Sequence, residues 1–312
     1  MAVLPPNSQD RPRIAVLLGP TAVGKTQVAL ELARRLGAEI INADSLQVYR
    51  ELNIGTAKPT PAERALVRHH LVDVVAPPEP YDAARYSREG RAAAADIQGR
   101  GRAPLVVGGT GLYIKALLYG LFDDGSPAGG VRRRLRQELT ELGLEPLYQR
   151  LRYLDPAVAD RLSPQDTYRI LRALEVIEAT GLPLSAWHAA HRFQDCPYQV
   201  LKLGLTRPRE ELCRRIDQRV EAMLAAGWLA EVEGLLSRYP AGLKPFKALG
   251  YRHLIAYLMG RWGLEEAVTL LKRDTRRYAK RQLNWFRADA EIKWFDPGQI
   301  EEMALCLEDF FY

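Results

Sequence analysis

The segment GPTAVGKT at residues 19–26 constrains the fold more than any other part of the chain. It fits the pattern G-x-x-x-x-G-K-[ST], with the apolar run IAVLL before it and the helix-like stretch QVALELARRL after it. In such a loop, backbone N–H groups converge on phosphate oxygens at the N-terminus of a helix. The flanks therefore predict a strand, a phosphate-binding loop and a helix.

The rest of the chain predicts an α/β fold, a parallel sheet flanked by helices, with an all-helical insertion. Buried strands are predicted in AEIINAD, HLVDVV and APLVVGGTG, with helical stretches between them. This alternation predicts an open α/β sheet over residues 13–119. Residues 123–130, DDGSPAGG, are turn formers and predict a linker, after which the pattern is helical in period. A strand is predicted again in PYQVLKLGLT, helices from Pro208 to about Arg287, and a short late strand in EIKWFD. We therefore predict a core of residues 13–122 and 191–312, and a helical insertion of residues 123–190.

Charge and cysteine usage narrow the class of protein. Lys and Arg outnumber Asp and Glu by 44 to 38, a net charge of +6 that suits a protein handling polyanions only where it is clustered. The cysteines Cys196, Cys213 and Cys306 have neither metal-ligand nor disulfide spacing. The stretch MAVLPPNSQDRPR lacks the long apolar run typical of a signal peptide, and no segment carries eighteen consecutive apolar residues. We expect a reduced, cytoplasmic protein that does not engage a membrane.

A carboxylate is missing where a nucleotide hydrolase or kinase would need one to hold its metal. The strand best suited to carry it, APLVVGG, ends in Gly108, Gly109 and Thr110, with no carboxylate. The acid is Asp44, which closes the strand AEIINAD and should face the phosphate loop, because parallel strands end at the same edge. Asp44 could act on an acceptor as a base, or it could be the N-cap of a helix beginning in SLQVYREL, and the spacing leaves both open.

The segments GPTAVGKT, INADSLQVYRELNIGTAKPT, LVVGGTGLYIKALLYG and RRYAKRQLNWFR together closely resemble the tRNA dimethylallyltransferases, also called tRNA isopentenyltransferases. The resemblance runs in order from about residue 13 to 295. It implies a transferase that moves a dimethylallyl group from dimethylallyl diphosphate to N6 of adenosine 37, next to the anticodon of tRNA. The phosphate loop would then hold a diphosphate leaving group, and Mg²⁺ would be the cofactor.

The resemblance assigns roles at the reacting centre. Asp44 takes the proton from N6, Thr110 contacts the acceptor side near the diphosphate bridge, and an arginine of the R-x-x-L-x-x-R-I-x-x-R segment reaches the diphosphate. We favour Arg215 for that contact, with Arg219 second; for either one, a solvated helix charge paired with Glu211 or Asp217 is the alternative. For Thr110 the alternative is a helix N-cap. The diphosphate would be bound by Gly19, Pro20, Thr21, Ala22, Val23, Gly24, Lys25 and Thr26, with the Thr26 hydroxyl on the metal.

tRNA contacts are predicted in several clusters. Arg273, Arg277, Arg281 and Asn284 form one stripe if residues 272–287 are helical, which suits a phosphate backbone, with a solvated face as the alternative. The Gln47 amide suits hydrogen bonding to the edge of an adenine that has been flipped out of its stack. The alternative is that Gln47 contacts Asp44, three residues earlier, at the start of a helix. The resemblance adds residues 168–172 and 247–252 to this set. The predicted tRNA-binding set is Asp44, Ser45, Leu46, Gln47, Thr110, Arg132, Tyr168, Arg169, Ile170, Leu171, Arg172, Lys247, Ala248, Leu249, Gly250, Tyr251, Arg252, Arg273, Arg277 and Arg281. By pattern alone Ile170 and Leu171 are ordinary core residues.

Two other functions are consistent with the phosphate loop. A small-molecule kinase would use ATP and place an acid on the third strand, and an RNA-binding module would only sense a nucleotide. The partners expected for the transferase are the tRNA anticodon stem-loop and dimethylallyl diphosphate, and we expect a monomer.

Overall fold

The fold is that of a computed structural model, which describes residues 11–121, 130–191 and 196–312. The chain divides into two compact units, Met1–Leu118 with Cys196–Tyr312, and Tyr119–Asp195. We call them the sheet unit and the helical unit. The linker predicted at residues 123–130 lies outside the described residues except for Gly130, which begins a helix.

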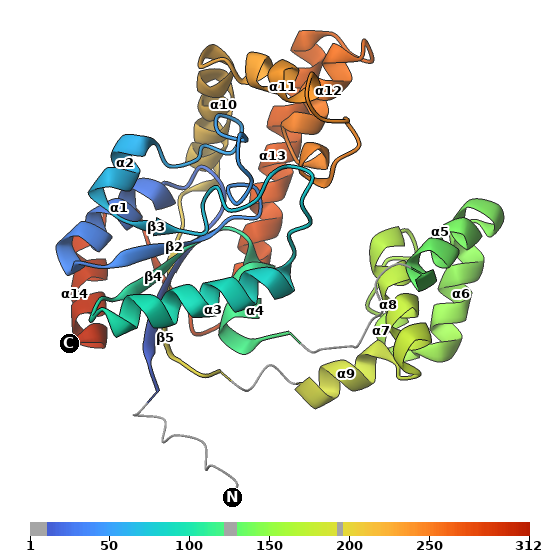
Figure 1. Cartoon of the computed structure of the whole chain (residues 1–312), viewed down its shortest axis with the longest axis horizontal. Helices are drawn as coiled ribbons and strands as arrows, with labels where there is room; N and C mark the ends of the chain where they lie inside the picture. The colour runs from blue at the N-terminus through green and yellow to red at the C-terminus, as the bar shows by residue number, and fades with distance from the viewer. Residues whose placement is uncertain (1–10, 122–129, 192–195) are drawn as a thin grey trace, which may run out of the picture. The chain divides into compact units, whose positions relative to one another are not determined.

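The sheet unit is built on six parallel strands in the order β3-β2-β4-β1-β5-β6 (Figure 1). This arrangement confirms the predicted α/β class. The two strands that carry the phosphate loop and the candidate base lie on either side of β4, so their carboxyl ends open at one edge. The strands are β1 (Arg13–Leu18), β2 (Glu39–Ala43), β3 (His69–His70), β4 (Pro104–Gly108), β5 (Gln199–Leu205) and β6 (Lys293–Phe295).

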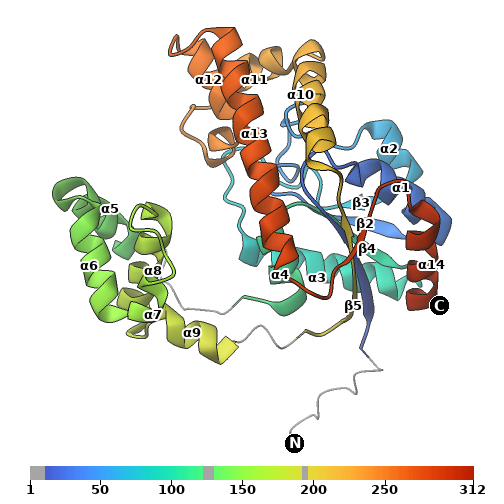
Figure 2. The ribbon, with the colours of Figure 1, turned by 180° about the vertical axis from the view of Figure 1, so that it is seen from behind.

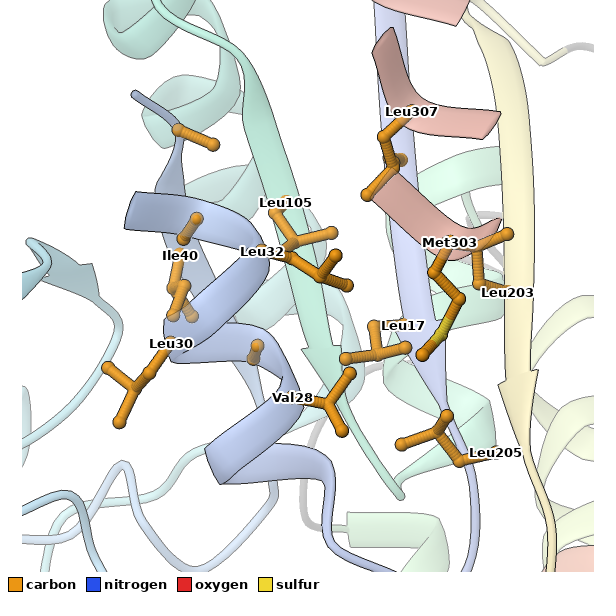
Figure 3. Packing of buried hydrophobic residues seen from close by; sticks show 14 of the residues in the cluster. Leu17, Val28, Leu30, Leu32, Ile40, Leu105, Leu203, Leu205, Met303 and Leu307 are labelled. Atoms are coloured by element: carbon orange, nitrogen blue, oxygen red, sulfur yellow. The ribbon is translucent and has the colours of Figure 1, made fainter. Parts of the chain in front are cut away.

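Helices cover both faces of this sheet. On one face α1 and α14 pack side by side, and Figure 3 shows Leu17 of β1 between Val28 of α1 and Met303 of α14. On the other face α3 packs against β2 and β4. Figure 2 shows α10 and the first part of α13, which contact each other, beyond the carboxyl edge of the strands, whereas the end of α13 lies beside the sheet. The helices of this unit are α1 (Lys25–Leu36), α2 (Pro61–Leu66), α3 (Ala83–Gly99), α4 (Gly111–Tyr119), α10 (Arg209–Ala225), α11 (Trp228–Leu236), α12 (Tyr251–Leu258), α13 (Leu264–Arg287) and α14 (Ile300–Phe311), with a 3-10 turn, η2 (Lys244–Lys247).

The prediction of a strand in HLVDVV is largely wrong. Only His69 and His70 pair with β2, and the chain then turns. Leu71 and Asp73 have positive φ values of 61° and 59°, which a strand does not tolerate. Asp73 instead turns its carboxylate to Lys58 and Arg64, at 2.5 and 2.8 Å.

The helical unit contains α5 (Gly130–Leu142), α6 (Leu144–Leu154), α7 (Pro156–Ala159), α8 (Thr167–Thr180) and α9 (Leu184–His191). It has its own apolar core, in which Leu135 of α5, Leu151 of α6 and Ile170 of α8 are almost fully buried. No helix in the described part of either unit is both long and apolar enough to cross a membrane.

A buried carboxylate stabilises the start of β2. Glu39 is 4% exposed and accepts hydrogen bonds from Arg100 and His70, with Arg102 and Arg68 also within 4 Å. The hydrogen bonds from Arg100 are the main cause that lowers the pKa of Glu39 to about 2. The ionised carboxylate therefore stabilises the folded state, and protonation removes that contribution.

We expect this contribution to be complete above about pH 4.5 and to be lost as the pH falls toward 2, because the pKa is lower in the folded state. The difference in unfolding free energy between wild type and Glu39→Gln should shrink by about 3 kcal/mol between pH 5 and pH 2. Denaturant unfolding at each pH measures it. Glu301→Gln, which breaks the exposed ion pair with Arg35, is the control and should show almost no difference at either pH. A pH-independent difference for Glu39→Gln would contradict this account.

Candidate functional site

The carboxyl edge of the sheet carries a pocket of about 710 Å³. Its walls come from the phosphate loop, residues 44–57, α10, residues 247–252 and α13, all of which belong to the sheet unit. Asp44 is the only carboxylate among the lining residues, against six cationic side chains. These are Lys25, Arg215, Arg219, Lys247, Arg252 and Arg281. The pocket therefore suits an anionic ligand.

The phosphate loop presents unused backbone donors. Gly24 is the N-cap of α1 with φ 114°, a conformation that favours glycine, and α1 starts at Lys25. Within the described residues, the backbone N–H groups of Gly24, Lys25 and Thr26 have no hydrogen-bond acceptor. Unpaired N–H groups at the positive end of a helix form an anion site.

Lys25 lies over this loop. Its ammonium group donates to the carbonyls of Gly19 and Pro20, at 3.0 and 2.8 Å. Burial is the main cause that lowers the pKa of Lys25 to about 7; the nearby charge of Arg219 lowers it further, and Asp44 opposes the shift. A bound anion would supply the countercharge that this lysine lacks.

Asp44 directly follows β2 and lines the pocket. One carboxylate oxygen, Oδ1, accepts hydrogen bonds from the backbone N–H groups of Leu46 and Gln47, at 2.9 and 3.4 Å. Residues 45–48, which follow Asp44, form a turn and not a helix, so the alternative of a helix N-cap is wrong. Oδ2 has no hydrogen bond within the described chain and is available to a ligand.

Thr110 follows β4, the neighbour of β2. Its hydroxyl accepts a hydrogen bond from the backbone N–H of Ser45 at 3.1 Å, and its own N–H donates to the carbonyl of Ala43 at 3.1 Å. No side-chain hydrogen bond to its own helix is found within the described residues, so the structure does not favour the N-cap alternative. Thr110 ties the turn of Asp44 to the end of β4, although Gly109, and not Thr110, lines the pocket.

The arginines of α10 face the phosphate loop. Arg215 and Arg219 both line the pocket, and Arg215 Nε donates to the Ala22 carbonyl at 2.9 Å. The two acids considered as alternative partners of these arginines form ion pairs elsewhere: Glu211 with Arg207, and Asp217 with Arg276. Burial is the main cause that lowers the pKa of Arg219, and the charge of Arg215 adds to it, while Asp44 opposes the shift.

Residues 44–58, which we call the 44–58 loop, are fixed by side chains. Gln47 uses both amide hydrogens on the carbonyls of Thr56 and Ala57, each at 3.1 Å. Lys58 is buried, and donates to the Tyr49 carbonyl at 2.7 Å and to Asp73 at 2.5 Å. A flipped base could therefore use only the carbonyl oxygen of Gln47, as an acceptor.

Helix α11 joins the 44–58 loop to residues 247–252. Glu231 accepts hydrogen bonds from the backbone N–H groups of residues 53, 54 and 55, at 2.9, 2.7 and 3.2 Å, and from the Tyr251 hydroxyl at 2.8 Å. The indole of Trp228 lies against Gly55 and Gly250, where an added Cβ would approach it to 2.1 Å in each case. These two glycines are required by close packing, and Tyr251 is fully buried.

The basic helix α13 contributes to the site in two ways. Arg281 lines the pocket, whereas Arg273 and Arg277 do not and have side chains that are 47% and 64% exposed. Asp274, the only acid of residues 272–287, contacts Arg273, Arg277 and also Arg252, the last at 2.7 Å. It therefore holds the predicted tRNA-binding side chains of two segments in one cluster.

The predicted tRNA-binding residues of the helical unit do not line the pocket. Tyr168 is 79% exposed and the Arg169 side chain 65% exposed, whereas Ile170 is fully buried, so its side chain cannot contact tRNA. Leu171 packs against the same core. Arg132 pairs with Glu175 at 2.9 Å, as Arg172 does at 3.4 Å.

Sequence reasoning missed four residues of this arrangement: Arg207, Trp228, Glu231 and Gln282. Arg207 Nε donates to the Val23 carbonyl at 2.9 Å, next to the contact of Arg215. Gln282 links the phosphate loop to the end of β4. Each acts on a segment far away in the chain, and no local pattern marks such a contact.

Comparisons with known proteins agree with this geometry. The sequence model of a family described as IPP transferase matches residues 47–289, and one described as isopentenyl transferase matches residues 12–74. The chain is 54% identical over 292 residues to a tRNA dimethylallyltransferase of Syntrophobacter fumaroxidans, covering 93% of this chain and 85% of that protein. It is 49% identical to one of Geobacter metallireducens, covering 97% and 99%.

Solved structures show the same likeness. The crystal structure of a tRNA isopentenylpyrophosphate transferase from Bacillus halodurans superposes with a TM-score of 0.71 at 36% identity, covering 96% of each chain. A eukaryotic dimethylallyltransferase, captured in crystallographic snapshots acting on tRNA, gives a TM-score of 0.83 at 29% identity, covering 96% of this chain and 79% of that one.

Proposed function

This chain belongs to the IPP transferase family of tRNA dimethylallyltransferases, and on that basis we propose that it transfers a dimethylallyl group from dimethylallyl diphosphate to N6 of adenosine 37 in tRNA. One observation carries the proposal. A phosphate loop surrounded by cations shares its pocket with a single carboxylate, Asp44, and that carboxylate follows β2 and not β4. Such a site can hold a diphosphate and accept a proton from a second substrate.

The donor side stabilises the leaving group. The backbone N–H groups of residues 24–26, Lys25, and Arg215 or Arg219 of α10 would surround the diphosphate. As the bond between the allylic carbon and the diphosphate oxygen breaks, negative charge grows on that oxygen. Donors fixed in advance around this charge lower the barrier.

The acceptor side supplies the nucleophile. The N6 lone pair forms the new bond to the allylic carbon, the diphosphate leaves with the electron pair of the C–O bond, and Oδ2 of Asp44 takes a proton from N6. Asp44 can do this because Oδ1 is occupied by the turn and Oδ2 is not. Thr110, held against Ser45, would position the acceptor near the diphosphate bridge.

The residues present fit a Mg²⁺ ion bound mainly through its substrate. Within the described chain, no group of three or more His, Cys, Asp or Glu side chains could hold a metal. Mg²⁺ bound to a diphosphate needs only one or two protein ligands, and the Thr26 hydroxyl at the start of α1 lies where the loop would present the phosphates. When bound, the ion would neutralise charge on the diphosphate.

We propose that the anticodon stem-loop is bound by the exposed arginines of α13 together with Lys247, Ala248, Leu249 and Arg252, and by Arg132, Tyr168, Arg169 and Arg172 of the helical unit. The adenosine would leave its stack to reach the pocket, which costs less in an unpaired loop than in a duplex. The 44–58 loop would receive it, with Gln47 accepting a hydrogen bond. The monomeric state and the cytoplasmic location remain predictions.

Arg277→Ala should weaken tRNA binding about threefold to tenfold at low salt and reduce the slope of log Kd against log salt by about 1, because one phosphate contact is lost. The donor KM should not change, since Arg277 does not line the pocket. Filter binding over a salt series measures the tRNA Kd and its salt slope, and steady-state kinetics measure the donor KM. Arg34→Ala on α1 is the matched control, because Arg34 is also exposed but lies away from the pocket. Equal slopes for Arg277→Ala and wild type would remove Arg277 from the interface.

The proposed reaction is tested with labelled dimethylallyl diphosphate, Mg²⁺ and undermodified tRNA. We expect label on the tRNA, at adenosine 37, and none on a transcript with guanosine at that position. Hydrolysis of ATP without labelled tRNA would instead support a small-molecule kinase. Binding of tRNA with no label transferred and no ATP hydrolysed, and with no activity changed in Asp44→Ala, would support an RNA-binding module.

A further inference from the structure

Gln282 is a neutral, buried side chain in a helix that is otherwise strongly basic. It lies in the KRQLNWFR stretch of α13, is 8% exposed, and lines the pocket. A buried amide is costly unless its polar atoms are paired. Its partners therefore show what it does.

Both ends of the Gln282 amide bond to the edge of the sheet. Oε1 accepts a hydrogen bond from the Thr21 backbone N–H at 2.9 Å, and Nε2 donates to the Gly109 carbonyl at 2.8 Å. The partners belong to the phosphate loop and to the turn that follows β4. The amide cannot be turned over, because the oxygen would then face a carbonyl and the NH₂ group an N–H.

The space around Gly109 shows how closely these segments approach one another. A Cβ at Gly109 would lie 2.4 Å from Gln282 Nε2 and 3.3 Å from the Gly19 carbonyl oxygen. Glycine at this position thus permits the phosphate loop, the end of β4 and α13 to meet. Thr110, the candidate acceptor-side residue, comes next in the chain.

We propose that Gln282 is a positioning residue that fixes the spacing between the phosphate loop and the Gly109–Thr110 turn. This inference rests on the proposed function, in which the loop holds the donor diphosphate and the turn lies beside the acceptor. Gln282 contacts neither reacting atom. It sets the distance and angle between the allylic carbon and N6, and a misplacement of 1 Å can cost about a hundredfold in rate.

Gln282→Met tests the proposal, because methionine has a similar length but neither donor nor acceptor. We expect kcat to fall about 10²-fold, with unchanged tRNA affinity and a change of less than about threefold in the affinity for inorganic diphosphate, the donor-side probe. A structural role alone would lower the melting temperature and the active fraction, leaving kcat per active site unchanged. Gln98→Met is the control: the Gln98 amide also joins two elements, with a 2.8 Å bond to the Arg13 carbonyl, but lies outside the pocket.

Gln282→Glu gives a second signature. A protonated carboxyl can still donate to the Gly109 carbonyl and accept from Thr21, whereas a carboxylate cannot donate. The rate of this variant relative to wild type should therefore rise as the pH falls from 8 to 6. Wild type is the reference at each pH because Lys25, Asp44, Arg219, Tyr278 and Arg281 line the same pocket and affect both proteins.

The outcomes separate the two ideas. Transfer by wild type together with wild-type kcat in Gln282→Met would overturn the positioning role and leave the function intact. A slow Gln282→Met combined with a pH-independent ratio for Gln282→Glu would assign the loss to side-chain shape, and would also overturn it. Absence of transfer by wild type would overturn the proposed function itself.

Discussion

Asp44→Asn should lower kcat for transfer by about 10²–10⁴-fold and change tRNA affinity by less than about threefold. The structure makes this substitution conservative in all but one respect. The asparagine carbonyl can replace Oδ1 as the acceptor for the N–H groups of Leu46 and Gln47, so the turn is kept. The amide nitrogen replaces the Oδ2 atom and cannot accept a proton. Single-turnover transfer at saturating donor and tRNA measures the loss.

Two further variants sharpen this experiment. Asp309→Asn removes an exposed carboxylate of α14 outside the pocket, and should transfer at the wild-type rate. Asp44→Ala removes the turn acceptor as well, so it should be at least as slow as Asp44→Asn and should melt at a lower temperature. If Asp44→Asn kept more than a tenth of the wild-type kcat, Asp44 would not be the base.

Lys25→Met should lower kcat/KM for the donor by about 10²–10³-fold, because a charge directed at the leaving group is removed. Affinity for inorganic diphosphate should fall at least about tenfold, while tRNA affinity stays within about twofold. The carbonyls of Gly19 and Pro20 also lose their donor, which would loosen the loop. Calorimetric titration with diphosphate and steady-state kinetics separate binding from the chemical step.

Lys293→Met is the matched control for this substitution. Lys293 is an exposed lysine of β6 outside the pocket, so its loss should leave both diphosphate binding and transfer unchanged. Equal diphosphate affinities for Lys25→Met and wild type would show that the anion is held without Lys25. The donor would then be bound mainly by the loop N–H groups and by α10.

The sheet and the ends of its strands could be predicted because their signals are local. GPTAVGKT lies between an apolar run and an amphipathic stretch, and the structure has β1 and α1 there. Asp44 was predicted to lie at the carboxyl edge because parallel strands end together, and it lines the pocket. The short β3 was overpredicted because Leu71 is buried in a bend and Val75 in a single bridge to Tyr49, and a hydrophobic pattern alone does not distinguish these from a strand.

The side chains that hold the site together could not be predicted in the same way. Thr21 and Gln282 are 261 residues apart, and Gly55 and Glu231 are 176 apart. An amide or carboxylate in a helix gives no local sign of which distant N–H it will accept from. Even a residue inside a family motif can have a role that the motif does not reveal. Lys58, the lysine of GTAKP, donates a hydrogen bond to Asp73 and does not line the pocket.

The division of the chain has a consequence for how this enzyme could diversify. Every residue that lines the pocket lies in Met1–Leu118 or Cys196–Tyr312, and the chain leaves this unit after Leu118 and returns at Cys196. The helical unit has its own apolar core, so evolution or an experimenter could exchange it as a cassette between relatives. If the helical unit binds tRNA as we propose, such a chimera would inherit its chemistry from one parent and its choice of tRNA, in part, from the other.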